Sequence, residues 1–188
     1  MGFSMMLLAN NSPSLNLVLI NNAGILRVPP KDLTGARKVY NELFNVHITS
    51  VAIMTMAFTH LLYKSSDPKV INISSGLGSM QNALTKKMGR YPPYGASKIG
   101  MNGLTVHLQV VENDRVKAEG EIQLGKPRIR YYTCAPGPLK TAFNGFRGPK
   151  LPDDGAEVVV HLLADDKQTY EGGTYWEFEE GQMRQVPW

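Results

Sequence analysis

The sequence of 188 residues contains a single cysteine, Cys134, and only two tryptophans. One cysteine excludes a disulfide within the chain and leaves no set of Cys and His residues at the spacing of a structural zinc site. We therefore expect no metal centre and a reducing, cytoplasmic setting.

Long apolar runs and basic clusters are also absent. No uninterrupted apolar run approaches the roughly 20 residues that a membrane-spanning helix needs. The segment from Met1 to Ala9 is mostly apolar, but no Lys or Arg precedes it, so it predicts buried structure rather than a signal peptide. The densest basic group, Lys86, Lys87 and Arg90, lacks the interleaved aromatics of a nucleic-acid site. We expect neither a membrane nor a nucleic acid as a partner.

The hydrophobic content of 43% suffices for one sizeable core, so residues 1–188 are expected to form a single domain. Strand-like apolar runs alternate with helical segments along the chain. The predicted strands are 15–20, 69–73, 128–133 and 173–178, and the predicted helices are 35–63, 94–113 and 154–163. This alternation indicates βαβ units and an α/β fold with a mostly parallel sheet.

Tyr94 and Lys98 are the first residues with a chemically informative spacing. Four positions apart on a helix, they lie on one face, one turn from each other. A nearby ammonium favours the phenolate and lowers a tyrosine pKa, which would make Tyr94 a general acid or base. Such a pair is common by chance, and by itself it indicates only an aromatic ring beside a solvated charge.

Ser75 adds a hydroxyl just beyond the end of the predicted strand 69–73, where open α/β sheets place their ligands. Two further turns follow neighbouring strands at the same edge. Asn21-Asn22-Ala23-Gly24 comes after the first strand, and Pro136-Gly137 with Thr141 comes after the third. Four sequence elements therefore converge on one edge of the predicted sheet.

This ordered set resembles the short-chain dehydrogenase/reductase family, and fungal-type members are similar from about residue 15 to residue 188. The resemblance implies a Rossmann-like doubly wound fold and NAD(P) as cofactor. It also implies that Ser75 polarises a substrate carbonyl, Tyr94 transfers a proton, and Lys98 binds the nicotinamide ribose. The remaining cofactor contacts that it implies are Asn22, Ala23, Gly24, Pro136, Gly137 and Thr141.

The sequence departs from the family at the phosphate-binding turn. No Gly-x-x-x-Gly-x-Gly segment precedes Leu15. Such a turn supplies the backbone N–H groups that hold a pyrophosphate. We therefore expect the first βαβ half to be absent and the sheet to keep strands 4-5-6-7 of the family order. NAD(P) would then bind weakly or not at all, and strand 15–20 would become an exposed edge.

Two smaller departures concern the site. His47 stands where the family has an asparagine that supports a proton relay, and it is either a relay residue or a structural substitute. A spacing of 19 positions separates Ser75 from Tyr94, which indicates a loop insertion. Residues 80–93 would then form a substrate mouth that faces residues 142–152.

The leading functional hypothesis is an oxidoreductase that reduces a carbonyl or oxidises a secondary alcohol through Ser75, Tyr94 and Lys98. One alternative is a cofactor-independent isomerase, dehydratase or cyclase that uses Tyr94, Ser75 and His47 for proton transfer. Another is a non-catalytic interaction protein. We also expect a homo-oligomer, formed through helices 35–63 and 94–113 and the strand edge.

Overall fold

One mixed sheet forms the centre of the molecule. The computed structural model describes residues 5–9, 16–86, 88, 90–122 and 125–188, with side chains except in 5–9 and 119–122. Within these ranges the sheet has six strands in the order β1-β2-β3-β4-β5-β6. The strands are β1 Met5–Ala9, β2 Leu17–Asn21, β3 Lys69–Ile73, β4 Arg130–Ala135, β5 Thr174–Glu179 and β6 Gln182–Gln185. The four inner strands run parallel and the two outer ones antiparallel, which confirms the predicted α/β class.

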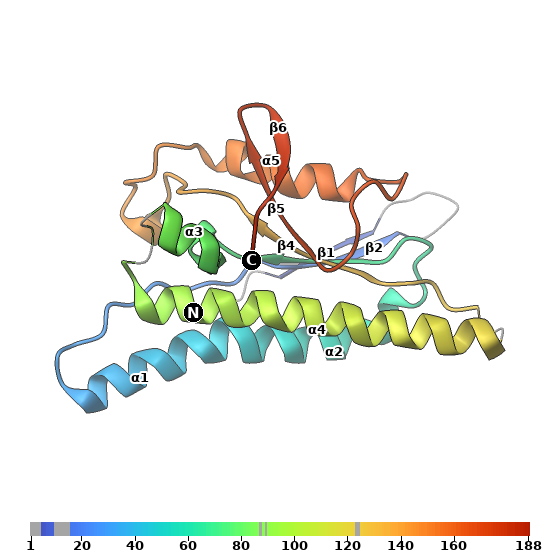
Figure 1. Ribbon diagram of the computed structural model, residues 1–188, viewed down its shortest axis with the longest axis horizontal. Coiled ribbons are helices and arrows are strands. Elements are labelled where there is room, and N and C mark those ends of the chain that lie inside the picture. The colour runs from blue at the N-terminus through green and yellow to red at the C-terminus, as the bar shows by residue number, and fades with distance from the viewer. Residues whose placement is uncertain (1–4, 10–15, 87, 89, 123–124) are drawn as a thin grey trace.

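Helices cover both faces of this sheet, as Figure 1 shows. α1, α2 and α4 lie against one face and α5 against the other. The long helices are α1 Leu33–Phe44, α2 Ser50–Leu62, α4 Pro92–Ile122 and α5 Pro152–Leu163. A π-helical turn, Asn45–Thr49, joins α1 to α2, so the predicted helix 35–63 is confirmed as two helices joined end to end.

Alternation along β2 explains why the sheet is covered twice. Leu17 and Leu19 pack in a core cluster with Leu62 of α2. Val18 and Ile20 point the other way and pack with the α5 side chains of the second cluster. A strand that is apolar on both faces therefore needs a helix layer on each side.

The exposed edge predicted at strand 15–20 is wrong. β1 pairs antiparallel with β2 over its whole length, from Met5 opposite Asn21 to Ala9 opposite Leu17. The apolar N-terminal segment supplies the hydrogen-bond partners along the outer side of β2, so β2 is not an edge strand. Residues 1–4 of that segment lie outside the described residues.

Two further elements differ from the sequence prediction. The segment 80–93, predicted as an inserted loop, contains α3, Met80–Thr85, and a 3-10 turn, Gly76–Gly78, precedes it. α4 continues to Ile122, well past the charged stretch where the prediction ended it near residue 113. Short helices and charged solvent-facing turns lack the apolar periodicity on which such predictions depend.

The helical run Leu33–Leu62 is long and apolar enough, by length and composition alone, to cross a membrane. A core helix meets the same criterion. Leu43, His47, Val51, Thr55 and Leu62 form its buried stripe, which packs against the rest of the molecule. The expectation of no membrane partner stays a prediction.

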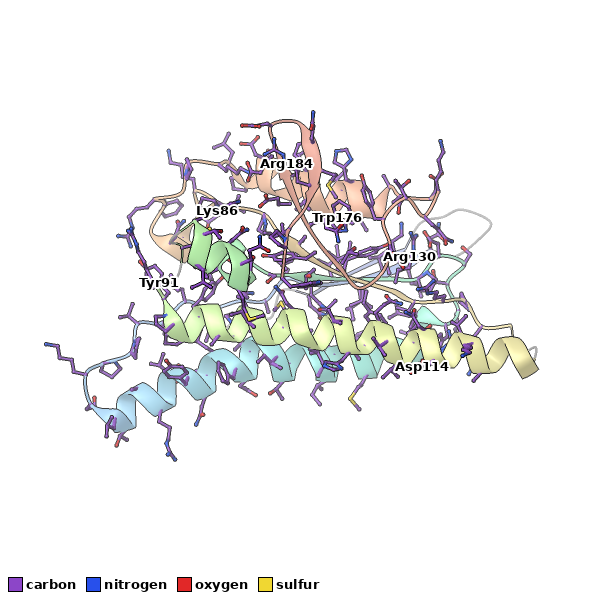
Figure 2. All side chains as sticks on the ribbon, viewed as in Figure 1. Lys86, Tyr91, Asp114, Arg130, Trp176 and Arg184 are labelled. Atoms are coloured by element: carbon purple, nitrogen blue, oxygen red, sulfur yellow. The ribbon has the colours of Figure 1, made fainter. Side chains whose placement is uncertain are left out.

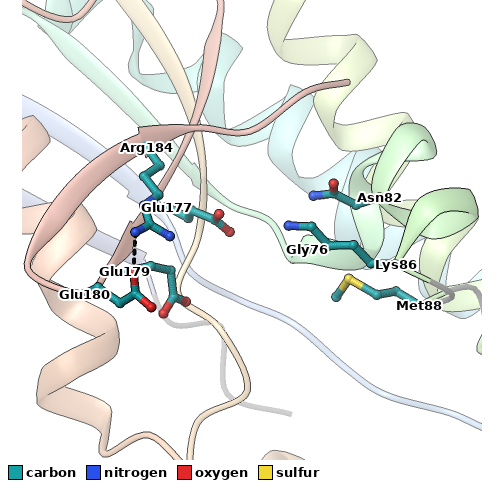
Figure 3. Close-up of a pocket in the computed structure, with 8 residues that line it drawn as sticks. All are labelled: Gly76, Asn82, Lys86, Met88, Glu177, Glu179, Glu180 and Arg184. Carbon is teal, nitrogen blue, oxygen red and sulfur yellow. Dashed lines mark hydrogen bonds and ion pairs between the residues drawn. The ribbon is translucent and has the colours of Figure 1, made fainter.

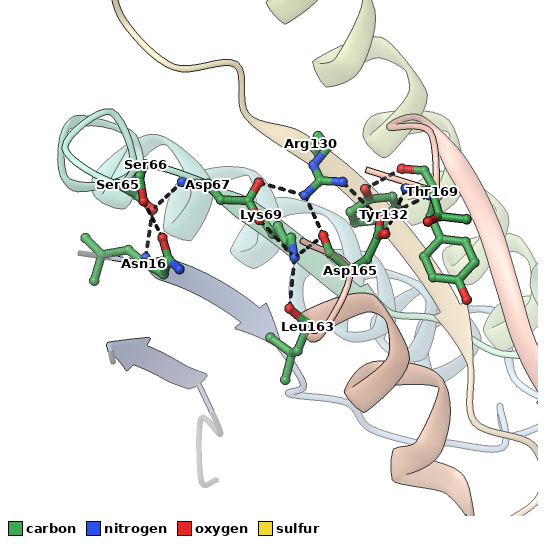
Figure 4. A network of polar contacts seen from close by, with 12 residues as sticks. Asn16, Ser65, Ser66, Asp67, Lys69, Arg130, Tyr132, Leu163, Asp165 and Thr169 are labelled. Carbon is green, nitrogen blue, oxygen red and sulfur yellow. Dashed lines mark hydrogen bonds and ion pairs between the residues drawn. The ribbon is translucent and has the colours of Figure 1, made fainter. Parts of the chain in front are cut away.

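An ion-pair network closes the amino ends of β3 and β4 (Figure 4). The Lys69 ammonium donates to the carbonyl oxygens of Leu163 at 2.9 Å and Asp165 at 3.0 Å. The Arg130 guanidinium donates to the Asp165 carboxylate at 3.0 Å and to that of Asp67 at 2.6 Å. Figure 2 shows Arg130 far from Lys86 and Tyr91, which lie near the other end of the strands.

Candidate active site

The carboxyl ends of β2, β3 and β4 meet at one edge of the sheet, and side chains join them there. Asn21 at the end of β2 donates from Nδ2 to Asn72 Oδ1 at 2.8 Å. Asn72 in turn donates to Thr105 Oγ1 of α4 at 2.9 Å. These bonds hold the segments that carry the predicted site residues in a fixed relation to each other.

Tyr94 lies in the first turns of α4 and is 7% exposed. Burial raises its pKa to about 12, and a side-chain hydrogen bond with Ser75 opposes that rise. The phenol is therefore protonated at neutral pH. This differs from the expectation that Lys98 brings the pKa down toward neutrality, because in this structure the loss of solvent outweighs any stabilisation of the phenolate.

Ser75 follows β3 in extended backbone and caps the 3-10 turn, its hydroxyl accepting from the Leu77 N–H at 3.3 Å. The Tyr175 hydroxyl of β5 donates to the Ser75 carbonyl oxygen. The neighbouring Ser74 is committed elsewhere, because its hydroxyl donates to Asn102 Oδ1 at 2.7 Å. Of the two serines, Ser75 is thus the one beside Tyr94.

Lys98 lies one turn after Tyr94 and is buried. Its ammonium donates to the Ile73 carbonyl oxygen at 2.8 Å and lies 5.7 Å from the centre of the Tyr94 ring. Burial lowers the pKa of Lys98 to about 7, an effect that Cys134 partly opposes. An amine with this pKa exchanges protons readily near neutral pH.

His47 belongs to the π-helical turn and is fully buried. Its Nε2 accepts the Ile25 N–H at 3.1 Å, so Nδ1 carries the proton and donates to Ser97 Oγ at 2.8 Å. Ser97 donates to the Tyr94 carbonyl oxygen at 2.7 Å. Both ring nitrogens are engaged, which favours the structural alternative for His47 over the relay.

We expect His47 to make the fold acid-sensitive. Burial, with a smaller effect of the Lys98 charge, lowers its pKa from 6.5 to about 3. Between these values the unfolded chain binds a proton that the folded chain does not, so stability falls as the pH drops. His47→Asn should reduce the slope of the urea-unfolding free energy against pH over this window, by up to about 1.4 kcal/mol per pH unit. The exposed His60→Asn is the control, and an unchanged slope in His47→Asn would contradict the assignment.

Of the predicted cofactor contacts, Gly24 lies beside this group. Gly24 is close to His47 and to Phe143, because a Cβ built on Gly24 would come within 3.5 Å of His47 Nε2 and 3.7 Å of the Phe143 ring. Gly137 adopts φ +85°, which favours glycine. Asn22 and Ala23 lie between Gly24 and β2, Pro136 follows β4, and Thr141 precedes the 3-10 turn Ala142–Asn144.

Two aromatic residues at this site are not indicated by the sequence. The Phe143 ring lies 6.0 Å from the Tyr94 ring, centre to centre. Tyr175 ties β5 to Ser75 as described above. Both act through contacts between distant segments, and no local pattern in the sequence signals them. Among the described residues, no group of three or more His, Cys, Asp and Glu could hold a metal ion.

An α/β sheet with a buried tyrosine and lysine and a partly buried serine at its carboxyl edge is typical of ligand-binding α/β proteins. The short chain dehydrogenase family matches residues 13–151. A short-chain dehydrogenase/reductase of Aspergillus fumigatus is 54% identical over 175 residues, which cover 91% of this chain and 66% of the relative. The chain belongs to the short-chain dehydrogenase/reductase family.

A more distant relative is a short-chain dehydrogenase of Penicillium roqueforti, 32% identical over 156 residues, which cover 79% of this chain and 57% of the relative. The chain thus spans about three fifths of the length of these relatives. Among solved structures, the NADPH-bound carbonyl reductase from chicken fatty liver superposes with a TM-score of 0.69 at 23% identity, covering 94% of this chain and 67% of the other. Carbonyl reductase Sniffer of Drosophila melanogaster gives 0.68 at 24% identity and covers 95% and 68%. These structures share the fold.

Proposed function

We propose that this chain carries the substrate and proton-transfer side of an NAD(P)-dependent reductase that interconverts a carbonyl and a secondary alcohol. One observation carries the proposal: Tyr94 is buried, hydrogen-bonded with Ser75, and one helical turn from the buried Lys98. Family membership and the fold shared with carbonyl reductases support it.

The residues present fit the nicotinamide end of such a cofactor. Lys98 and Tyr94 offer polar groups there, and Pro136, Gly137 and Thr141 would complete the contacts with it. Asn22, Ala23 and Gly24 would lie on the adenosine side, where Gly24 presents backbone without a side chain. The Phe143 ring, 44% exposed, lies between Gly24 and Tyr94 and would turn outward when a ligand enters.

The proton chemistry follows from the two pKa values. Tyr94, with a pKa raised to about 12, holds its proton at neutral pH and donates it to the oxygen of a carbonyl substrate. The Ser75 hydroxyl donates a hydrogen bond to the same oxygen and stabilises the charge that develops there. Lys98, with a pKa of about 7, then favours return of a proton to Tyr94. The bound cofactor supplies the hydride in reduction and accepts it in oxidation.

In this proposal β2, β3, β4 and β5 correspond to strands 4-5-6-7 of the family sheet. Their contiguous parallel order supports the correspondence. β1 then stands where another parallel strand of the family would pair with β2, and it runs in the opposite direction.

The test is a calorimetric titration of the 188-residue chain with NADPH and with NADH. Charge-assisted hydrogen bonds of the kind made by a phosphate-binding turn are each worth about 1.5–3 kcal/mol. Without two of them, affinity falls at least about a hundredfold. We therefore expect a measurable dissociation constant well above the micromolar range. Submicromolar binding would contradict the proposed loss of phosphate contacts. No binding at the highest nucleotide concentration that the titration reaches would contradict the cofactor assignment.

The same titration separates the reductase from the cofactor-independent isomerase, dehydratase or cyclase. In that alternative Tyr94, Ser75 and His47 would transfer protons. The hydrogen bonds at both His47 nitrogens count against His47 in that role but leave Tyr94 and Ser75 available, so nucleotide binding decides between the two functions.

We also propose that the protein self-associates, in a cytoplasmic setting. Exposed apolar side chains on α1 and α2, Leu33, Ile53 and Met56, support a helix-mediated interface, as do Val110 and Val111 on α4. The strand edge no longer contributes, since β1 covers it. Sedimentation velocity at micromolar concentration should detect dimers or larger species, and a monomer alone would contradict the proposal.

A further inference from the structure

A hollow of about 330 Å³ opens between α3 with its flanking turns and the β5–β6 hairpin (Figure 3). Gly76, the residue after Ser75, lines it, so it begins next to the proposed catalytic serine. Met88 lies against Gly76, where a Cβ would come within 3.1 Å of the Met88 methyl carbon. This volume is at the lower end of the range of small-molecule sites.

Asn82 of α3 lines the hollow with a polar group that lacks a protein partner. Its residue is only 6% exposed, yet its carboxamide makes no hydrogen bond to any described part of the chain. Figure 3 shows the carboxamide on the same wall as the Lys86 ammonium, facing the hairpin. The residue as a whole is nearly buried, but its carboxamide atoms reach the hollow, so this donor and acceptor are available to a ligand.

The charges around the hollow are paired except for two. Glu180 pairs with Arg184 at 2.5 Å, and Glu179 pairs with Lys150 at 2.5 Å. Lys86 and Glu177 form no ion pair within the described residues, and they face each other from opposite walls. The hollow therefore presents one positive and one negative group, separated by open space.

This arrangement selects against charged ligands of either sign. An anionic substituent that approaches Lys86 meets the Glu177 carboxylate, and a cationic one that approaches Glu177 meets the Lys86 ammonium. A hydroxyl satisfies both walls, because it donates to the carboxylate and accepts from the ammonium or from the Asn82 amide. We infer that this hollow binds the hydroxyl-bearing, uncharged part of the substrate, so that the substrate class is neutral hydroxylated carbonyl compounds. The inference rests on the proposed function.

The test is an amide NMR titration of the isotope-labelled 188-residue chain with four related ketones at neutral pH. They are acetophenone, its meta-dihydroxy derivative, its meta-carboxylate derivative and its meta-aminomethyl derivative. The dihydroxy compound should bind at least about tenfold tighter than acetophenone, as expected for two or more added hydrogen bonds. The carboxylate and the ammonium compounds should bind no tighter than acetophenone, and shifts should centre on Gly76, Asn82 and Glu177.

Single substitutions should change this selectivity in opposite directions. Glu177→Gln should raise affinity for the carboxylate about tenfold, and Lys86→Met should raise affinity for the aminomethyl compound by a similar factor. Asn82→Leu should lower the affinity for the dihydroxy compound severalfold without changing the affinity for acetophenone. The exposed Lys167→Met and Glu171→Gln, at the other end of the strands, are matched charge controls and should change nothing.

The inference is overturned if the dihydroxy compound binds no tighter than acetophenone, or if the Glu177 and Lys86 variants leave the order of affinities unchanged. Thermal unfolding of each variant checks that the fold is intact. Because the readout is binding, it is independent of redox turnover. Selective binding without hydride transfer would support the hollow as a binding site and contradict the reductase proposal. Turnover without selective binding would support the reductase proposal and contradict the role of the hollow.

Discussion

Tyr94→Phe is expected to lower carbonyl reduction by about two to four orders of magnitude, the range that one general acid contributes. The substitution removes the proton that the raised pKa keeps on the phenol at neutral pH. It retains the ring and its contacts with His47 and Phe143, at 5.4 Å and 6.0 Å between ring centres. The fold should therefore be unchanged.

The measurement is a single-turnover reduction of the dihydroxy ketone with NADPH in large excess. Tyr40→Phe, which removes a partly exposed hydroxyl on α1, is the matched control and should keep the full rate. Retention of activity within a few-fold in Tyr94→Phe would show that another group donates the proton.

Arg130→Met is expected to cost about 3–5 kcal/mol of unfolding free energy, the usual result of removing one partner of a buried ion pair. Arg130 and Asp165 are both nearly fully buried, and their charged groups are 3.0 Å apart. The same guanidinium also pairs with Asp67 at 2.6 Å, so one substitution leaves two carboxylates with a lost partner. Lys69 remains for Asp67, at 3.1 Å.

Urea unfolding measures this loss. Arg128→Met is the control, because Arg128 makes an exposed contact with Asn113 and its removal should change stability by less than about 0.5 kcal/mol. Equal effects of the two substitutions would mean that the network at the amino ends of β3 and β4 contributes little.

Much of the scaffold could be predicted because its signal is local. The predicted strand KVINI, residues 69–73, has the same bounds as β3. The predicted helix 35–63 ends one residue after α2 does. Ser75 comes just after β3, and Tyr94 and Lys98 lie in the first turns of the next long helix, α4. The order of strand and helix along the chain predicts that all three meet at the carboxyl edge of the sheet. Chain order and periodicity thus suffice to bring these three together.

The remainder depends on pairing between distant segments. β6 has mostly exposed side chains and no apolar alternation, so no pattern predicts it as a strand. The apolar composition of β1 predicts burial but does not show that β1 pairs with β2. The sequence predicts an inserted loop at residues 80–93, and nothing in it indicates that the Asn82 side chain lies in a hollow with Glu177. The two nitrogens of His47 likewise became assignable only with Ile25 and Ser97 in place.

We propose that the edge formed by Ser75, Tyr94 and Lys98 reduces a carbonyl with hydride from a nicotinamide cofactor. The most direct test is single-turnover incubation of the chain with NADPH deuterated at the transferable position and the dihydroxy ketone, followed by mass spectrometry of the alcohol. The account predicts one deuterium on the carbinol carbon with the native chain and none with Tyr94→Phe. Absence of label with the native chain, at NADPH concentrations shown by titration to occupy it, would contradict the account.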